Sequence, residues 1–358
     1  MHYHISAEAK KVLLRHILKK VSRSFYLSLI ILPKAIRTQV SLAYLFCRMA
    51  DTIADTRLFQ SSQRLQALEN LRRQLREESS TTEKLTTLQA VALPQDACDG
   101  ERQLLIHLPD CLRLFYSLSD MDRHLIRKLV LTLTRGMEMD LTYFLDRNTV
   151  IIRAFPDLTT LDQYTYYVAG VVGEFWTDIH GTHLSVWRRD DLPSLYTLGV
   201  RFGKGLQMTN ILKDLGRDIS KGRCYIPMDY LTSLGVNIED LNDPSILPRI
   251  RPLIDKLIRT TLDHLDHARD YILHFPAYAL RSRLSCMWPL LFAVQTLQAV
   301  YQSDRLLHPA TKIKISRRTI YWTIFWSLWC LMFPALFPIY YAHLRQRLIR
   351  LLKADCLR

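Results

Sequence analysis

The chain has 358 residues, enough for one large domain or two ordinary ones with a buried core. Hydrophobic residues make up 49% and charged residues 23%, which excludes a disordered or collagen-like chain. Its 48 Lys and Arg against 34 Asp and Glu give a net charge of +14, which favours a polyanionic partner: nucleic acid, an acidic membrane or a phosphorylated ligand.

The amino-terminal part indicates helices, and we expect no cleavable signal in it. The first residues are basic and amphipathic, and they carry Glu8 and no long apolar stretch. Leu65, Leu68, Leu71 and Leu75 recur every three or four residues, which predicts an amphipathic helix. The scattered cysteines form no CxxC motif and are typical of a reducing compartment. Because no alternating strand pattern and no glycine-rich nucleotide motif occurs, we expect an all-α fold.

The first chemically informative pattern is the segment YLFCRMADTIAD at 44–55. On a helix, Tyr44, Arg48, Asp51 and Asp55 would fall within about 60° of one another, with the two carboxylates about 6 Å apart along the axis. Aspartate is a poor helix former, so two on one stripe beside apolar neighbours need a reason. One interpretation is a pair of oxygen ligands for Mg²⁺. The other is a solvated acidic face with Arg48 as its salt-bridge partner.

A second segment, YTYYVAGVVG at 164–173, contains small residues at helical spacing. Ala169 and Gly173 are four apart, so one helix face is nearly bare, and another backbone or a ligand chain can approach closely. Ordinary tight helix packing is the alternative, and this pattern alone favours it. Tyr164 and Tyr167 offer aromatic faces to a cation, although helical tyrosines are often simply packed in a core.

The third segment carries a second polar stripe. Gln207, Asn210, Asp214 and Asp218 would share a helix face about 80° wide, which makes a poor core and an unusual surface. Gly216 would weaken this helix unless a close approach or a local bend requires it. Two such acidic stripes facing each other would bind several Mg²⁺ ions around a diphosphate and promote its departure. Cations suited to phosphate oxygens lie close by in the sequence: Lys213, Arg217, Lys221 and Arg223.

The carboxy-terminal part differs from the rest of the chain. No charged residue occurs from Thr319 to Ala342, which is longer than the roughly 20 residues of a membrane-spanning helix. The alternative is a buried or interfacial helix kinked at Pro334 and Pro338. Both flanks are basic, so the positive-inside rule gives no orientation. We expect an all-helical domain over 1–311, a basic hinge over 312–318, a transmembrane or membrane-anchoring helix over 319–342 and a basic tail over 343–358.

The three motifs together resemble the squalene and phytoene synthase family, which joins two prenyl diphosphates head to head. They are SRSFY at 22–26 with YLFCRMADTIAD, then YTYYVAGVVG, then LQMTNILKDLGRDISKGRCYIP at 206–227, in the family's order. The resemblance implies a single all-α domain of the class I isoprenoid-synthase type with a central active-site cavity. It also implies a two-step reaction through a cyclopropyl diphosphate, with farnesyl or geranylgeranyl diphosphate as substrate.

The resemblance also implies roles for individual residues. The ligands of Mg²⁺ would be Asp51, Asp55, Asn210, Asp214 and Asp218. The diphosphate and the mouth of the site would be contacted by Ser22, Arg23, Ser24, Arg48, Gln207 and Asn210. The catalytic residues beside the reacting carbons would be Tyr44, Arg48 and Tyr164.

The resemblance leaves the product open. Squalene synthases reduce the final cation with NADPH, whereas phytoene and dehydrosqualene synthases lose a proton instead. If NADPH is used, its phosphate would be bound by Lys312, Lys314, Arg317 and Arg318, which suit a lipid headgroup equally well. Squalene synthase is the expectation, and a non-catalytic, membrane-tethered helical assembly factor is a remote alternative.

The position of the positive charge refines the expected partners. Nine Lys and Arg against one Asp lie in residues 312–358, so +8 of the net +14 surrounds the apolar segment. We therefore expect a membrane-associated protein with a cytoplasmic catalytic domain, and a diphosphate substrate. Nucleic acid is not an expected partner, because no basic helix interleaved with aromatic residues occurs.

Overall fold

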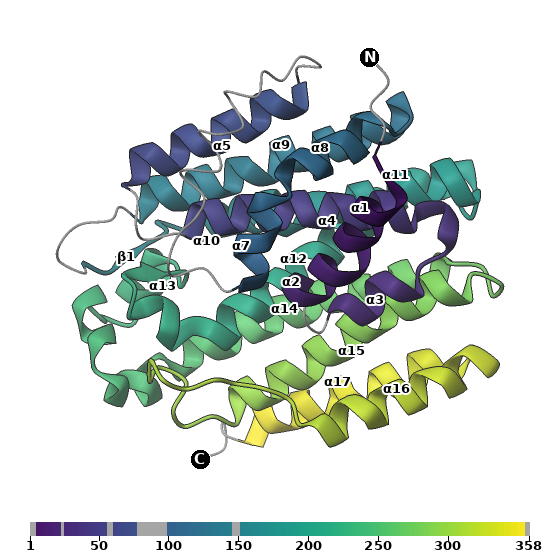
Figure 1. Ribbon diagram of the computed structural model, residues 1–358. Coiled ribbons are helices and arrows are strands. Elements are labelled where there is room, and N and C mark those ends of the chain that lie inside the picture. Colours follow the sequence, from purple (N-terminus) through teal and green to yellow (C-terminus); the bar gives the residue numbers. More distant parts are fainter. Residues whose placement is uncertain (1–4, 23–24, 56–59, 77–98, 145–150, 355–358) are drawn as a thin grey trace. The chain divides into compact units, whose positions relative to one another are not determined.

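The computed structural model describes residues 5–22, 25–55, 60–76, 99–144 and 151–354 (Figure 1). They belong to two compact units: Met1–Asp146 with Asp178–Ser185, and Arg147–Thr177 with Val186–Arg358. Helices make up almost all the regular structure of the described residues, which confirms the all-α prediction. The one sheet among them is a parallel pair of two-residue strands, β1 (Arg153–Ala154) and β2 (Arg223–Cys224).

The first unit is built around the helix that carries the first acidic stripe. Its elements are α1 (Ala7–Lys11), η1 (Val12–Ile17), α2 (Leu18–Ser22), α3 (Tyr26–Ile31), α4 (Lys34–Asp55), α5 (Ser61–Arg76), α7 (Asp99–Ile106), α8 (Leu108–Tyr116) and α9 (Asp120–Tyr143). Pro33 precedes α4, and Ser119 caps α9 by accepting a hydrogen bond from the amide of Asp122. Leu68, Leu71 and Leu75 are fully buried on α5, as their spacing predicts.

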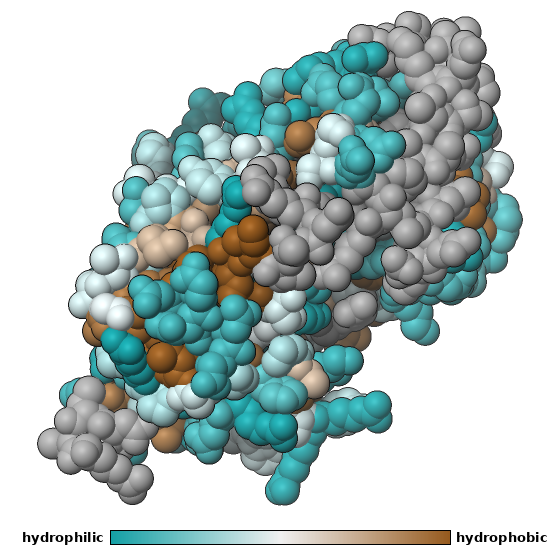
Figure 2. Space-filling view, turned by 90° about the vertical axis from the view of Figure 1, so that its left-hand side faces the viewer, coloured by the Kyte–Doolittle hydropathy of each residue, from teal (hydrophilic) through white to brown (hydrophobic). Residues whose placement is uncertain are grey.

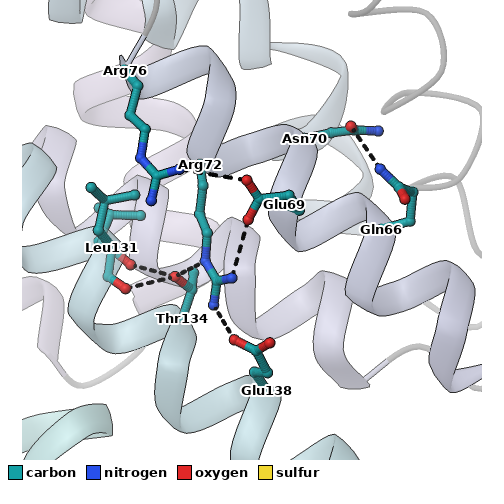
Figure 3. Close-up of polar contacts among 9 residues, drawn as sticks. Gln66, Glu69, Asn70, Arg72, Arg76, Leu131, Thr134 and Glu138 are labelled. Carbon is teal, nitrogen blue, oxygen red and sulfur yellow. Dashed lines mark hydrogen bonds and ion pairs between the residues drawn. The ribbon is translucent and has the colours of Figure 1, made fainter.

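A polar network joins α5 to α9 (Figure 3). The guanidinium of Arg72 donates to the Thr134 hydroxyl at 2.8 Å and to Glu138 Oε2 at 2.8 Å. Its remaining nitrogen donates to Glu69 Oε2 at 3.2 Å. Charged groups therefore lie at the edge of a leucine-lined contact, as expected for amphipathic helices.

Figure 2 shows one face of the molecule, where most of the described surface is hydrophilic and hydrophobic residues form smaller areas.

The second unit contains the longer helices. Its elements begin with α10 (Leu158–Thr165), the π-helical turn η3 (Tyr166–Gly170) and α11 (Val171–Leu184), whose last residues belong to the first unit. The chain continues through η4 (Arg189–Asp191), α12 (Leu192–Ile219), α13 (Met228–Ser233), η5 (Ile238–Asn242), η6 (Pro244–Ile246), α14 (Leu247–His274) and α15 (Leu280–Tyr301). Two further helices, α16 (Arg317–Met332) and α17 (Leu336–Ala354), follow.

The small residues of the 164–173 segment pack directly against another helix. A Cβ on Gly173 would lie 1.9 Å from the carbonyl oxygen of Gly199, and one on Gly203 would lie 2.1 Å from that of Ala169. The two backbones therefore touch, which only glycine permits at these positions. The close approach predicted from Ala169 and Gly173 is confirmed, and its partner is α12.

The apolar segment 319–342 is divided between two helices. α16 ends at Met332, and α17 begins at Leu336, so the chain turns near Pro334 and forms a helical hairpin (Figure 1). Among the described residues, the helix long and apolar enough to cross a membrane is α15, and 78% of its apolar window is buried inside the protein. α15 is therefore placed as a core helix, and membrane attachment of 319–342 stays a prediction.

Candidate active site

The first acidic stripe occupies the carboxy-terminal half of α4, as its spacing predicts. Tyr44, Arg48 and Asp51 are partly exposed, and Asp55 is exposed at the end of the helix. The opposite face of α4 is fully buried through Leu45, Phe46 and Met49 and other apolar residues. Because burial of that face fixes the rotation of α4, the stripe faces outward from the core of its unit.

Arg48 is held by carboxylates on two helices. It pairs with Glu101 on α7, and its Nη1 lies 3.6 Å from Asp51 Oδ2. Glu101 is the more enclosed partner, with 16% of its side chain exposed against 27% for Arg48. Glu101 was not predicted from the sequence, because it lies 53 residues from Arg48 and belongs to no motif.

The charge around Asp51 is unbalanced. Desolvation by the surrounding protein raises the pKa of Asp51 to about 7; the Arg48 guanidinium opposes this, while the nearby carboxylates of Asp55 and Glu101 add to it. A site where negative charge is this costly favours a bound cation, which would relieve the repulsion. The carboxylates of α4 therefore fit a divalent ion.

The end of α4 is fixed by a buried arginine. Arg64 on α5 is 1% exposed, and its Nη1 donates to the carbonyl oxygen of Ala54 at 2.7 Å. This bond satisfies one of the last carbonyl groups of α4, beside Asp55. Arg64 is a second residue without a sequence signal, because its bond to the end of α4 is a contact between two helices.

The tyrosine and serine predicted for this unit have local partners. The Tyr44 hydroxyl donates to the carbonyl oxygen of Val21 at 3.3 Å, and its ring stacks on Phe25 with centroids 5.6 Å apart. Ser22 is 4% exposed, and its hydroxyl donates to the carbonyl oxygen of Leu18 at 2.5 Å. Arg23 and Ser24 lie outside the described residues. Tyr44 and Ser22 thus share one neighbourhood at the junction of α2 and α4.

The second polar stripe lies on α12 in the other unit. Gln207, Asp214 and Asp218 are half-buried and Asn210 is exposed, so one face of α12 is polar over three turns. The other face is buried through Met208, Ile211, Leu212 and Leu215. This arrangement confirms that the polar residues share a helix face.

Basic residues surround the aspartates of α12. Lys213 Nζ donates to Asn210 Oδ1 at 3.1 Å and lies 3.6 Å from Asp214 Oδ2, and Arg217 Nη2 lies 3.2 Å from the same oxygen. Burial raises the pKa of Asp218 to about 6; Asp214 adds to the rise, and Arg217, Lys221 and Arg223 oppose it. Carboxylates and cations therefore alternate here, as a site for a metal ion and a diphosphate requires.

Gly216 is required by a close approach. A Cβ at this position would lie 2.5 Å from the carbonyl carbon of Leu307 and 2.7 Å from the carbonyl oxygen of Leu306. The segment that leads to the basic hinge therefore packs against the buried face of α12 at Gly216, opposite the polar stripe. The close approach that Gly216 predicted is confirmed.

Tyr164 is packed in an aromatic cluster. Its ring stacks on Tyr225 with centroids 5.2 Å apart and lies 5.3 Å from Phe155, and it is 7% exposed. The cluster lies beside the strand pair, which joins the start of α10 to the chain that leaves α12. The catalytic role of Tyr164 stays a prediction.

The four basic side chains of the hinge are all exposed. Lys312 and Lys314 precede α16, and Arg317 and Arg318 occupy its first turn, where Ser316 caps the helix by accepting from the Thr319 amide at 3.0 Å.

Within the described residues, no group of three or more His, Cys, Asp or Glu side chains could hold a metal ion by itself. A magnesium ion on either stripe would therefore complete its coordination with water and phosphate oxygens, as this ion commonly does.

Comparisons with known proteins agree with the helical fold and the order of the motifs. The profile of the squalene/phytoene synthase family matches residues 18–319. A squalene synthase of Eremothecium gossypii is 25% identical over 86% of this chain and 66% of its own length. A presqualene diphosphate synthase of Zymomonas mobilis is 27% identical over 84% of this chain and 88% of its own length. The chain thus spans just under two thirds of the first of these relatives.

Solved structures show the same fold. TcSQS in complex with the ligand E5700 superposes with a TM-score of 0.75 at 21% identity, over 98% of this chain and 99% of that chain. A dehydrosqualene synthase in complex with a ligand has a TM-score of 0.60 at 21% identity, over 91% of this chain and 97% of that chain. The resemblance drawn from the motifs is confirmed, and the chain belongs to the squalene/phytoene synthase family of prenyltransferase-type enzymes.

Proposed function

We propose that the protein condenses two molecules of farnesyl diphosphate head to head and forms squalene. The observation that carries this proposal is the pair of aspartate stripes on α4 and α12, each with a carboxylate whose pKa is raised, in a chain of this family. In the first step the carbon that loses its diphosphate forms two bonds to the double-bond carbons of the second substrate and releases one proton, which closes the ring of a cyclopropyl diphosphate. In the second step the other diphosphate leaves, and a hydride from NADPH completes squalene.

The aspartates are proposed to bind the diphosphates through Mg²⁺. Asp51 and Asp55 would hold ions on one stripe, and Asp214 and Asp218, with Asn210, on the other. Bound magnesium would supply positive charge that stabilises the departing diphosphate. That the two stripes face each other is part of the proposal.

The remaining residues of the site are proposed to orient the substrates. Arg48, held by Glu101, would keep its guanidinium at a diphosphate oxygen, and Gln207 would line the same mouth. Lys213 and Arg217 already bridge the polar stripe of α12 and could move to a phosphate without a backbone change. Apolar walls would keep water from the allylic cation.

The product formed from the cyclopropyl diphosphate differs between members of this family, so it needs a proposal of its own. Use of NADPH is proposed to depend on Lys312, Lys314, Arg317 and Arg318, the exposed basic residues of the hinge. The relative from Zymomonas mobilis favours a second candidate, in which the reaction ends at presqualene diphosphate. Two further alternatives need no NADPH. In one, the final cation loses a proton and forms dehydrosqualene; in the other, geranylgeranyl diphosphate is the substrate and phytoene the product.

Product analysis distinguishes these candidates. Purified protein is incubated with farnesyl diphosphate and Mg²⁺, with and without NADPH, and the products are extracted and identified by mass spectrometry. Squalene that forms only with NADPH supports the proposal. Presqualene diphosphate or dehydrosqualene, formed whether or not NADPH is present, would replace it with the corresponding candidate. A parallel incubation with geranylgeranyl diphosphate tests for phytoene.

The reaction is further proposed to take place at a membrane surface. The product is a hydrocarbon with negligible solubility in water, and the carboxy-terminal segment is both apolar and basic.

A further inference from the structure

The hairpin of α16 and α17 carries a continuous exposed apolar surface. Residues at three- and four-residue spacing along α16 form it, and we call it the outer stripe: Tyr321, Trp322, Phe325, Leu328, Trp329 and Met332. Between 41% and 69% of each of these residues is exposed. A row of large apolar side chains this open to water is unusual for a soluble surface and marks a site of interaction.

The outer stripe cannot turn inward, because the opposite face of α16 is fixed by buried polar contacts. Trp288 Nε1 donates to Ser327 Oγ at 2.8 Å, and Gln295 Nε2 donates to Thr323 Oγ1 at 2.8 Å. Thr323, Ser327 and Cys330 are fully buried against α15. These contacts fix the rotation of α16, so the exposure of the outer stripe is a property of the fold.

The basic residues of the hairpin lie at one end, and exposed apolar residues lie at the other end, where the chain turns. Trp326 stacks on Tyr340 with ring centroids 6.0 Å apart, which sets the register of the two helices. In this register the exposed basic residues of α17, Arg347, Arg350 and Lys353, lie near the start of α16. That end also carries the basic hinge. The opposite end, which we call the tip, exposes Met332, Phe333 and Ile339 at 69%, 52% and 64%.

We infer that this hairpin docks on an anionic lipid bilayer, with the outer stripe and the tip in one leaflet and the basic end at the headgroups. Tryptophan and tyrosine favour the boundary between headgroups and acyl chains, where an apolar ring and a polar group are both satisfied. Basic residues next to an apolar face are the pattern of interfacial helices that bind anionic lipid. The inference specifies the surface for membrane association and rests on the hairpin alone, not on the catalytic chemistry.

The hairpin is built to lie in one leaflet and not to cross the bilayer. α16 has 16 residues, or about 24 Å of helix, against a hydrocarbon core of about 30 Å. The inner face of the hairpin is also tied to the rest of the protein, since Asp266 on α14 accepts hydrogen bonds from Tyr341 at 2.9 Å and from Arg345 at 2.8 Å. A spanning segment would have to break these bonds.

Charge favours lipid over a second copy of the chain. The sequence contains no Asp or Glu between residues 305 and 354, so a second hairpin would offer no acidic partner to the basic end. Arg317 and Arg318 also occupy the first turn of α16, where the helix dipole disfavours cations. An anionic surface would compensate for this cost.

Vesicle flotation tests the inference with the full-length protein. Wild type is mixed with vesicles of phosphatidylcholine, or with vesicles in which about one third of the lipid is phosphatidylglycerol, and the bound fraction is measured. We expect binding to the anionic vesicles only, and release at high salt. We expect the triple variant Phe325→Ser/Trp329→Ser/Met332→Ser to bind at least roughly ten-fold more weakly, because exposed apolar area is lost from the stripe.

A second variant separates the charge from the apolar surface. Arg347→Gln/Arg350→Gln/Lys353→Gln should weaken binding to anionic vesicles by a similar factor. Two matched controls lie elsewhere: Met121→Ser/Ile151→Ser, at exposed apolar residues, and Arg135→Gln/Arg259→Gln, at exposed arginines. Neither should change binding. All variants are compared by circular dichroism, which should report unchanged helix content.

Four results would overturn the inference. The first is wild type that does not float with anionic vesicles, and the second is a triple variant that floats as well as wild type. The third is a wild-type dimer, seen by light scattering without lipid, that the triple variant converts to a monomer while vesicle binding is absent. Binding that persists through high salt and alkaline extraction would show a spanning segment instead, and it would also contradict a hairpin in one leaflet.

Discussion

Arg48 on α4 and Glu101 on α7 form an ion pair between two helices of the first unit. Arg48 is predicted to bind a diphosphate oxygen, whereas Glu101 lies outside every sequence motif. Glu101 also contributes to the raised pKa of Asp51, so one carboxylate influences both neighbouring functional groups. We therefore expect Glu101 to act as a positioning residue for the first stripe.

Glu101→Gln should lower activity with little effect on folding. Without the charge of Glu101, Arg48 loses its fixed orientation, and we expect kcat/KM to fall roughly ten- to a hundred-fold, the range expected when a substrate-positioning group is misplaced. Glu138→Gln, which removes one partner of Arg72, makes the same chemical change at a more exposed ion pair and should leave kcat/KM within about two-fold. Equal activity in the two variants would contradict the role given to Glu101.

Gly173→Ala should destabilise the second unit. The new Cβ would lie 1.9 Å from the Gly199 carbonyl oxygen, so the two backbones would have to separate. We expect the free energy of unfolding to fall by about 1–3 kcal/mol, measured by urea denaturation. Gly170→Ala is the matched control, because its nearest atoms, at 3.1 and 3.3 Å, belong to side chains that can adjust. If both variants were equally stable, the backbone contact would not be as tight as described.

Acid should weaken the packing around His264. This residue is 7% exposed on α14, and burial, helped by Arg201 and Lys204, lowers its pKa to about 4, against the opposing effect of Asp162 and Asp263. The unfolded chain binds a proton below about pH 6.5, whereas the folded chain does so only near pH 4, so stability should decline as the pH falls through this window.

His264→Gln provides the comparison for this effect. Glutamine does not titrate, so the variant should lose less stability than wild type between neutral pH and about pH 4.5, whatever its stability at neutral pH. Thermal melts across this range give the measurement. Parallel pH profiles for the two proteins would show that His264 does not carry the effect.

Asp266→Ala should loosen the hairpin of α16 and α17 from α14. The change leaves Tyr341 and Arg345 without their shared acceptor and should cost about 1–3 kcal/mol. Limited proteolysis should then cut near the turn at Pro334 sooner than in wild type. Asp270→Ala, one turn along α14 at a more exposed ion pair with Arg269, should not change the cutting pattern. Cleavage at the same rate in all three proteins would remove Asp266 as the attachment point.

The sequence predicts the local features of this fold well. The helical class, the sharing of a face by Asp51 and Asp55, and the close approaches at Gly173 and Gly216 all follow from spacing and side-chain size, which act over one or two turns of a helix. The sequence did not reveal Glu101 or Arg64, because their roles come from contacts between helices far apart in the chain. It also did not reveal that Pro334 separates two packed helices, since hydropathy measures apolar length and not the partners that cover it.

The central claim is that both aspartate stripes bind the diphosphates in one reaction, and consumption of farnesyl diphosphate by single variants tests it most directly. Wild type, Asp51→Asn, Asp214→Asn and the control Asp190→Asn, an exposed carboxylate before α12, are assayed with Mg²⁺ under identical conditions. We predict that Asp51→Asn and Asp214→Asn each reduce turnover by at least about a hundred-fold, because charge at the leaving group is the main demand of the reaction. We predict that Asp190→Asn matches wild type. Turnover by either stripe variant at the wild-type rate would contradict the account.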